Sequence, residues 1–449
     1  MSSPTEIYVH SPLRHPRLRY VLSLVGDDLG YRFRFYHEAS VFGPREHPFG
    51  ISYAAAGPHA LPHHPLLAGG APTPHDLAPA PGGPAGVPCF FATPTGPDLL
   101  ACIFFAVSRY EEYEAQDVAD AHGRFPATAS HAAAHGYLDR PVVREWTAAI
   151  GRQLRAWFPA LPAPRHRPLT LRPTYDIDLL WAWHHRGWRG RAAAARDLLC
   201  GQWARCLARV RSSPTADPYY TVDQLEALHH TLGLTATYFW LLSDRSDRVD
   251  PNPYPIPEAQ RALMRRLGER ALTGLHPSYY SSRREGVLQA EVERFRSIYG
   301  SDAPRSRQHY LRFRLPDTYR MLLAAGLRED HTMGYADAIG WRAGTNLPFA
   351  WYDLDREQTT RLIVHPFAAM DATLRHYLDL GAAGAGAEVI RLAGLVRAFG
   401  GPFTLLWHNS SFSSLYGWEG WYDAYVTLLR QLLDGDAAPW TPGRGGQSR

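Results

Sequence analysis

The sequence contains no lysine, because all 47 of its Lys and Arg residues are arginine. Without a lysine the chain cannot form a Schiff base, which excludes ordinary pyridoxal phosphate chemistry. A Walker-type phosphate loop, whose lysine contacts the phosphates, is excluded as well. A GC-rich coding sequence is the simplest cause of this bias, and it also accounts for the abundance of Ala, Pro and Gly.

Cysteine, net charge and long apolar runs are also scarce. The four cysteines form no C-x-x-C pair, which argues against a structural zinc site and predicts free thiols in a reducing compartment. The formal charge of +4 over 449 residues is small and looks dispersed, so we expect no nucleic-acid partner. No apolar run reaches the roughly 18 residues of a membrane span, and no secretory signal is evident. These absences predict a cytoplasmic protein without membrane insertion.

The length predicts two domains. Residues 1–165 are expected to form an N-terminal α/β domain of unknown role, with strands at Tyr31–Tyr36 and Leu99–Phe105. The charged and aromatic run Ser108–Tyr113 that follows is interpreted as a solvated helix face, with a functional site as the alternative. The second domain is expected over 166–437, followed by a disordered tail at 438–449.

After Pro168 the pattern changes to short apolar strands that alternate with helical stretches. Repeated βα units of this kind predict a parallel sheet. About seven units in this length favour an irregular (β/α)7-type barrel, so that the fold class is α/β. The expected strands are 169–178, 235–242, 272–276, 308–313, 331–334, 361–365 and 403–408.

Ionisable and ligating side chains recur where these strands end. Asp176 and Asp178 are two residues apart, so in a strand they point to the same face. Because the carboxyl ends of parallel strands lie on one face of an α/β fold, separated residues of this kind can converge. The others are His276, His309, Arg312, Asp330, His331, His365, Asp371 and His408.

Each of these residues has a structural alternative. A single histidine at a strand end is more often a hydrogen-bonded core or rim residue than a ligand. Asp176 and Asp371 could each cap the segment that follows. The recurrence at several strand ends favours a functional set over these alternatives.

An aspartate with two histidines is a good ligand set for a divalent metal, with positions left open for water and substrate. A nearby carboxylate can act as a general base and a further histidine as a general acid, a combination that suits hydrolysis of an amide or ester. Aromatic side chains near these positions would suit stacking on sugar rings, with core packing as the alternative. They are Tyr175, Tyr279, Tyr310, Trp341, Trp351, Trp407, Trp418 and Trp421.

Residues 169–435 resemble the polysaccharide deacetylase (NodB-type) superfamily of carbohydrate esterases, in a bacterial branch with an extra N-terminal domain. Thr174–Asp178 is similar to the first family motif, Thr-Phe-Asp-Asp. His276–Tyr280 is similar to the second motif, which supplies two metal-binding histidines four residues apart. Leu405–His408 is similar to the last motif, whose histidine acts on the leaving group.

The resemblance implies a divalent metal, zinc being the one expected, and it implies roles for individual residues. Asp176 would be the catalytic base, Asp178 and His276 metal ligands, and His408 the acid. The chain departs from the family in two places. Ile177 separates the two aspartates, which leaves their base and ligand roles open. Tyr280 stands where the family has its second histidine.

A metal site of the family type would then need a third ligand from elsewhere in the chain, unless the site is altered. His309 is the candidate, with His365 as the alternative. Arg312, in the same segment as His309, is a candidate for orienting a carboxylate or the substrate.

The predicted function is a metal-dependent hydrolase that removes acetyl groups from an N- or O-acetylated glycan, with the glycan as its partner. One alternative is a non-catalytic glycan-binding or scaffolding protein with a degenerate deacetylase site, which Tyr280 favours. The other is a glycosidase that uses two carboxylates, such as Asp176 and Asp330, across a cleft.

Overall fold

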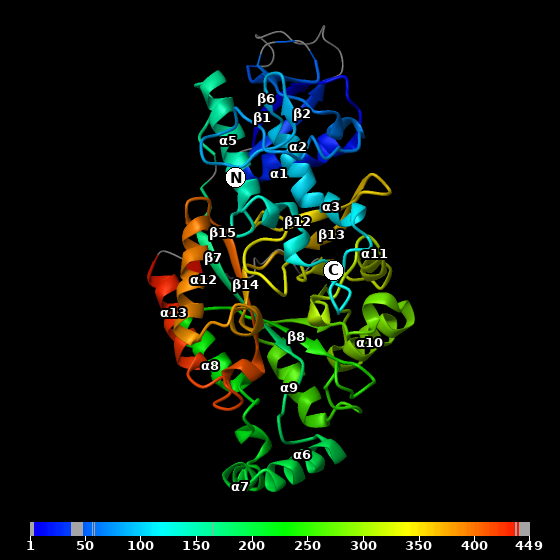
Figure 1. Cartoon of the computed structure of the whole chain (residues 1–449), viewed down its shortest axis with the longest axis vertical. Coiled ribbons are helices and arrows are strands. Elements are labelled where there is room, and N and C mark those ends of the chain that lie inside the picture. The colour runs from blue at the N-terminus through cyan, green and yellow to red at the C-terminus, as the bar shows by residue number, and fades with distance from the viewer. Residues whose placement is uncertain are drawn as a thin grey trace.

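The computed structural model describes residues 4–36, 48–55, 57, 59–164, 166–435 and 438–439. The N-terminal region, at the top of Figure 1, is built on a sheet whose four strands are all parallel in the order β2-β1-β3-β4. Helix α1 (Pro16–Leu29) connects β1 to β2 and begins with Pro16, which is well suited to a first helical position. The strands are β1 (Thr5–His10), β2 (Tyr31–Tyr36), β3 (Gly50–Tyr53) and β4 (Ala60–Leu61), and a separate hairpin joins β5 (Ala92–Thr93) to β6 (Gly96–Pro97).

The apolar run after Asp98 is a helix, α2 (Leu99–Ser108), so the prediction of a strand at Leu99–Phe105 is wrong. A run that is apolar at every position has no period that separates a buried strand from a buried helix. The Asp98 carboxylate decides the matter, because it accepts hydrogen bonds from the first free amides of the helix, those of Leu100 (2.9 Å) and Ala101 (3.1 Å). The other α-helices here are α3 (Tyr110–Glu114), α4 (His131–Ala134) and α5 (Val142–Trp157).

The second half of the chain is a mixed α/β structure around one large sheet. Its strands follow the order β12-β13-β11-β10-β9-β8-β7-β15-β14, and β16 also pairs with β7. All pairings are parallel except the β12–β13 hairpin. The strands are β7 (Leu169–Ile177), β8 (Thr237–Leu241), β9 (Leu272–His276), β10 (Arg305–Ser306), β11 (Glu329–Asp330), β12 (Phe349–Asp353), β13 (Gln358–Val364), β14 (Ala369–Met370), β15 (Gly401–His408) and β16 (Ala438–Pro439).

The strands do not close into the predicted (β/α)7 barrel within the described residues. β13 and β14 lie near opposite ends of the strand order and do not pair with each other. Only residues 365–368 separate them in sequence, however, and four residues span little more than a dozen ångströms. The sheet must therefore curl until its two ends are near each other, as an open barrel.

The expected fourth strand, 308–313, is displaced. The strand is β10, which ends at Ser306, and His309–Leu311 form a short 3-10 turn beyond it. Tyr310 and Leu311 have φ angles of 61° and 53°, a left-handed conformation that a strand does not contain. His309 therefore lies beyond the end of a strand, above the sheet, and not within it.

Helices cover the outside of the sheet, and two of them project from it. In Figure 1, α8, α12 and α13 lie on one side of the barrel and α9, α10 and α11 on the other. The α6–α7 hairpin projects at the end of the molecule opposite the N-terminal region. The α-helices are α6 (Gly187–Leu199), α7 (Trp203–Arg211), α8 (Val222–Leu232), α9 (Glu258–Gly268), α10 (Glu285–Tyr299), α11 (Asp317–Ala324), α12 (Ala382–Arg397) and α13 (Trp421–Asp434).

The charged run Ser108–Tyr113 joins the two halves of the molecule and is not a solvated helix face. Arg109 and Glu112 are both buried, and the Glu112 carboxylate is bound by Arg109 (2.7 Å) and by Arg342 of the second half (2.6 Å). Paired charges of this kind tolerate burial because each one is neutralised by its neighbour. The sequence pattern could not show that the partner, Arg342, lies 230 residues away.

No helix in the described part of the chain is long and apolar enough to cross a membrane. Of the predicted tail at 438–449, residues 440–449 lie outside the described residues.

Candidate metal centre

The alternation along β7 places the two aspartates inside the curl of the sheet. Tyr175 faces the covering helices, where its hydroxyl lies 2.8 Å from Tyr425 of α13 and 2.8 Å from His229 of α8. Thr174 and Asp176, on the other face, both contact Arg307 within the curl. Thr174 and Asp176, which are two residues apart in β7, therefore share a face as the alternation predicts.

Three histidines converge on Asp178 from the ends of other strands. His276 ends β9, His309 follows β10, and His408 ends β15. The Nε2 atom of His276 lies 3.1 Å from Asp178 Oδ1, and those of His309 and His408 lie 3.5 and 3.7 Å from Asp178 Oδ2. The fold thus brings together four residues that span more than 200 positions of sequence.

Each of these imidazoles is held through its other nitrogen. His276 Nδ1 lies 2.5 Å from the carbonyl oxygen of Arg307, His309 Nδ1 lies 2.9 Å from Asp250, and His408 Nδ1 lies 2.8 Å from Asp371. An acceptor at Nδ1 places a proton there, orients the ring and directs Nε2 towards the centre.

The atoms of Asp178, His276 and His309 fit a metal ion. Their ligand atoms all lie within 4.8 Å of one another. Asp178 Oδ1 and His276 Nε2 are buried, and neither has a hydrogen-bond partner even though they lie 3.1 Å apart. Ligands at about 2.1 Å around a tetrahedral zinc lie about 3.4 Å from each other, which matches separations of 3.1 and 3.5 Å.

The pKa of the Asp178 carboxylate and those of His309 and His408 are shifted in opposite directions. Burial raises the pKa of Asp178, but His309, His276 and His408 lower it more, so that it lies well below its ordinary value. Burial lowers the pKa of His309, but Asp178 and Asp250 outweigh it and raise the pKa to about 9. In the same way Asp371 and Asp178 raise the pKa of His408 to about 10 against the effect of burial.

Arg307, and not Arg312, contacts Asp176. Arg307 Nη1 donates to Asp176 Oδ1 at 2.9 Å, and both side chains are buried. Arg312 lies at the rim, where it donates to the carbonyls of His122 and Tyr279 at 2.7 and 2.6 Å. The arginine that contacts the carboxylate of Asp176 is therefore Arg307, five positions before Arg312.

Two further carboxylates contact the histidines of the centre: Asp250, which the sequence did not identify as a candidate, and Asp371. Asp250 lies in the loop after β8 and binds His309, and its position in a loop gave no signal. Asp371 was interpreted as a helix cap, and its Oδ1 does lie 2.6 Å from the amide of Ala372, but it also contacts His408. The signal for Asp371 was its place just after a strand end, beside His365.

Two residues named as alternatives lie away from this centre. The Asp330 carboxylate is fully buried and hydrogen-bonded to Tyr319 and Thr332, so it faces α11 and not a cleft shared with Asp176. Tyr280 lies at the surface beside Arg245 and Arg284. His309, and not Tyr280, lies with Asp178 and His276 at the centre.

A second group of possible ligands, Glu329, His331 and His365, lies around β11 and β13. The two imidazole rings are stacked with centroids 4.3 Å apart and planes only 3° from parallel. A histidine binds a metal in the plane of its ring, and two parallel planes share no point. His276 and His309, whose planes meet at 55°, do not have this restriction, which favours them over His365 as metal ligands.

Most of the aromatic residues considered for sugar stacking belong to the core. Tyr175, Trp341, Trp351, Trp407, Trp418 and Trp421 are buried. Tyr279 and Tyr310 remain at the rim, where Tyr310 contacts His309. His122 of the N-terminal region packs on Tyr310 and lies 3.4 Å from the Tyr279 hydroxyl, so that region contributes to the rim.

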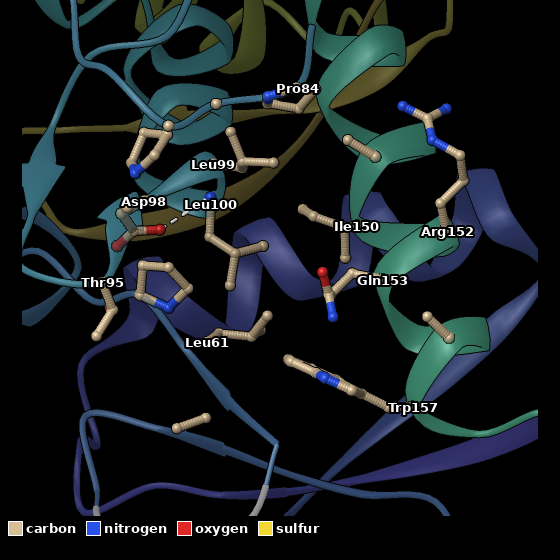
Figure 2. Close-up of a pocket in the computed structure, with 18 residues that line it drawn as sticks. Leu61, Pro84, Thr95, Asp98, Leu99, Leu100, Ile150, Arg152, Gln153 and Trp157 are labelled. Atoms are coloured by element: carbon tan, nitrogen blue, oxygen red, sulfur yellow. Dashed lines mark hydrogen bonds between the residues drawn. The ribbon is translucent and has the colours of Figure 1, made fainter.

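A separate pocket of about 560 Å³ lies in the N-terminal region between α2, α5 and β4 (Figure 2). Leu61, Leu100, Ile150 and Trp157 line it, with Arg152 beside them. The carboxylate at its edge, Asp98, already binds two α2 amides, the Tyr53 hydroxyl and the His64 amide. Among the described lining residues no carboxylate, histidine or thiol is available for catalysis.

Comparison with known proteins gives limited matches. Residues 7–159 match the model of a "Family of unknown function (DUF7033)". No curated protein matches the sequence.

Three solved structures align with the chain at TM-scores of 0.32 to 0.38. A "putative polysaccharide deacetylase from Mycobacterium smegmatis" aligns at 14% identity and a TM-score of 0.38, covering 63% of this chain and 96% of its own. A CE4 family pseudoenzyme from Bacillus anthracis aligns at 10% identity and a TM-score of 0.32, covering 62% and 67%. The 4-alpha-glucanotransferase from Thermococcus litoralis aligns at 12% and 0.32, covering 60% and 38%.

Proposed function

We propose that the protein is a divalent-metal-dependent hydrolase that removes acetyl groups from an N- or O-acetylated glycan. The observation that carries the proposal is the convergence of three anchored imidazoles on Asp178, beside a second carboxylate paired with a buried arginine. Asp178, His276 and His309 would hold the cation, and zinc suits a set of one oxygen and two nitrogen ligands. When bound, the cation supplies Lewis-acid polarisation of the acyl carbonyl and acidifies water.

Asp176 is assigned as the general base. The guanidinium of Arg307 neutralises one of its oxygens, and Oδ2 lies 3.7 Å from His276 Nε2, on the side of the metal ligands. Asp176 is thereby held in place beside the metal ligands, where it would accept a proton from the attacking water. The sequence left the base and ligand roles of the two aspartates open, and their contacts support one assignment. Asp176 is paired with Arg307 and would be the base, whereas Asp178 contacts the histidines and would be a metal ligand.

His408 is assigned as the general acid. Its pKa of about 10 leaves it protonated at neutral pH, so it can give a proton to the departing amine or alkoxide. Its side chain is 19% exposed and that of Asp178 is 26% exposed, whereas His276 is 1% exposed. The site therefore opens to solvent on the side of His408 and Asp178, where a sugar acetyl group would enter.

The sugar would contact the rim formed by Tyr279, Tyr310 and His122. Aromatic faces and a histidine suit recognition of a pyranose ring. This assigns the N-terminal region a part in substrate selection, because His122 belongs to it.

The test is metal content combined with acetate release. Purified protein should contain about one equivalent of zinc or a similar ion, and it should release acetate from N-acetylated chito-oligosaccharides or O-acetylated xylo-oligosaccharides. Asp178→Asn should lose both properties, whereas Asp379→Asn, at an exposed position, should keep both. Glycan binding without metal or acetate release would favour the non-catalytic alternative, and new reducing ends without acetate would favour a glycosidase.

A further inference from the structure

The α6–α7 hairpin projects from the body of the molecule at the end opposite the N-terminal region (Figure 1). It follows directly from β7, the strand that carries Asp176, and Asp217 holds its root. The Asp217 carboxylate accepts hydrogen bonds from the amides of Ala182 (2.7 Å) and Trp183 (2.8 Å). His184 and Ser212, on either side of the hairpin, are joined at 2.8 Å. The hairpin is thus a projecting unit with a fixed base on the face where the strands end.

Large apolar side chains of the hairpin are exposed to an unusual degree. Leu199 is 87% exposed, Val210 83%, Trp188 74% and Trp203 67%. On α7, Trp203, Leu207 and Val210 are spaced i, i+4, i+7 and form one stripe. On α6, Leu199 lies eleven residues after Trp188, which is about three turns along the same face. Only Asp197 is buried among the described side chains of the two helices. The α7 stripe is exposed along its whole length, because Trp203, Leu207 and Val210 are 67%, 49% and 83% exposed.

The positive charge of the protein is concentrated in the same segment. Residues 186–211 contain seven arginines and one acidic residue, Asp197, which gives a charge of +6, while the whole chain carries +4. All other residues together therefore carry −2. Asp197 is paired with Arg209 at 2.8 Å, within the hairpin itself. Five of the seven arginines lie towards the root, namely Arg186, Arg189, Arg191, Arg209 and Arg211.

The tip of the hairpin is therefore apolar, and its root is basic with Trp188 and Val210 among the arginines. Leu198, Leu199 and Trp203 lie where α6 ends and α7 begins, and they are 45%, 87% and 67% exposed. Arginine side chains can bind lipid phosphates while their stems cover apolar surface. An apolar end with a basic collar matches the polarity of an anionic bilayer, in which acyl chains lie below a layer of phosphates.

We propose that the α6–α7 hairpin is an interfacial membrane anchor that docks the protein on anionic phospholipid, with its tip at the boundary of the acyl chains and its root at the headgroups. A second copy of the chain is a poor occupant, because two segments of +6 repel each other. Leucine and valine do not stack on bases, which disfavours nucleic acid.

The experiment is co-sedimentation of the full chain with vesicles of phosphatidylcholine containing 30% phosphatidylglycerol, compared with pure phosphatidylcholine. We expect binding to the anionic vesicles, weakened by salt, and a loss of about tenfold or more for Leu199→Ser with Trp203→Ser. Ile390→Ser, which removes an exposed apolar side chain elsewhere, should bind like wild type.

Charge is tested with a matched pair of variants. Arg191→Gln with Arg211→Gln should weaken binding several-fold, whereas Arg270→Gln with Arg328→Gln removes the same charge from exposed positions outside the hairpin and should have little effect. Equal losses in the two pairs would indicate attraction by overall charge and would overturn the proposal.

Insertion is tested with an environment-sensitive fluorophore on Cys200, which is exposed in the turn between α6 and α7, in a Cys206→Ala background. Anionic vesicles should shift its emission to the blue, since Cys89 and Cys102 are buried and will not be labelled. No vesicle binding, or binding without a spectral change, would overturn the proposal. Salt-sensitive binding to single-stranded nucleic acid in place of vesicles would also overturn it and assign the hairpin to that class of partner. None of these readouts depends on deacetylase activity.

Discussion

Arg307 and Asp176 form a buried ion pair, 2.9 Å apart, inside the curl of the sheet. The same guanidinium donates to the hydroxyl of Thr174 at 2.8 Å and to the carbonyl oxygen of His331 at 2.9 Å, so its position is fixed by β7 and by the end of β11. Burial lowers the pKa of Arg307, and Asp176 opposes that effect. Arg307 thus holds the side chain of the proposed base, Asp176, in a fixed position relative to the strands.

Replacing Arg307 with glutamine should lower kcat for acetate release about 100-fold, because Asp176 loses the guanidinium that holds one of its oxygens in place. Breaking a buried ion pair also costs about 3–5 kcal/mol of stability, so unfolding should be measured in parallel. Arg312→Gln, at the rim, should keep kcat close to the wild-type value, and a loss as large as that of Arg307→Gln would return the orienting role to Arg312.

Asp371→Asn should move the alkaline limb of the kcat profile to lower pH. Asp371 is the main cause that raises the pKa of His408 to about 10, and the acid is active only while it is protonated. Without the negative charge the proton is lost earlier as the pH rises. The measurement is kcat from pH 6 to 10.5, with Asp379→Asn, an exposed neighbour, as the control. An unchanged alkaline limb would mean that His408 is not the acid.

Metal binding should release a proton from His309. Asp178 and Asp250 raise its pKa to about 9, so the free site carries this proton at neutral pH and a cation must displace it. The apparent zinc affinity should rise about tenfold per pH unit from pH 7 until it levels off near pH 9. Calorimetry in buffers of different ionisation enthalpy measures the proton directly. Zinc binding with no proton released would remove His309 from the ligand set.

Asp250→Asn should weaken metal binding by about 10- to 100-fold, the effect usual for losing the carboxylate that orients a histidine ligand. Asp250 Oδ1 lies 2.9 Å from His309 Nδ1 and also accepts from the Tyr279 amide at 2.9 Å. Tyr280→Phe should leave the affinity unchanged, because Tyr280 lies at the surface. Competition with a chromogenic chelator reports both values, and equal affinities for the two variants would contradict the assignment of Asp250.

Glu291→Gln should stabilise the protein at pH 8 more than at pH 5. Burial raises the pKa of Glu291 to about 7, so between its ordinary value of 4.5 and 7 the folded state binds a proton that the unfolded state has lost. Stability attributable to this group therefore falls as the pH rises across that window, by about 3 kcal/mol at most. Thermal unfolding of Glu291→Gln and of Glu293→Gln, an exposed control on the same helix, should differ increasingly from pH 5 to pH 8.

The sequence by itself determined the strand ends that carry chemistry. The period of two along Leu169–Ile177 fixes which side chains share a face, and the apolar runs that become β7, β9 and β15 end at or next to Asp176, His276 and His408. These are local properties, set by alternation and by the length of an apolar run, and they need no knowledge of distant residues.

Only the tertiary structure decided which distant residues complete the site. Arg307, Asp250 and Asp371 act through contacts across 37 to 131 positions of sequence, and no local pattern encodes such contacts. The left-handed backbone at Tyr310, next to His309, likewise depends on the packing around it. The charge of the α6–α7 hairpin can be counted from the sequence: residues 186–211 carry +6, whereas the whole chain carries +4. Only the fold shows that this segment projects into solvent with its apolar side chains exposed.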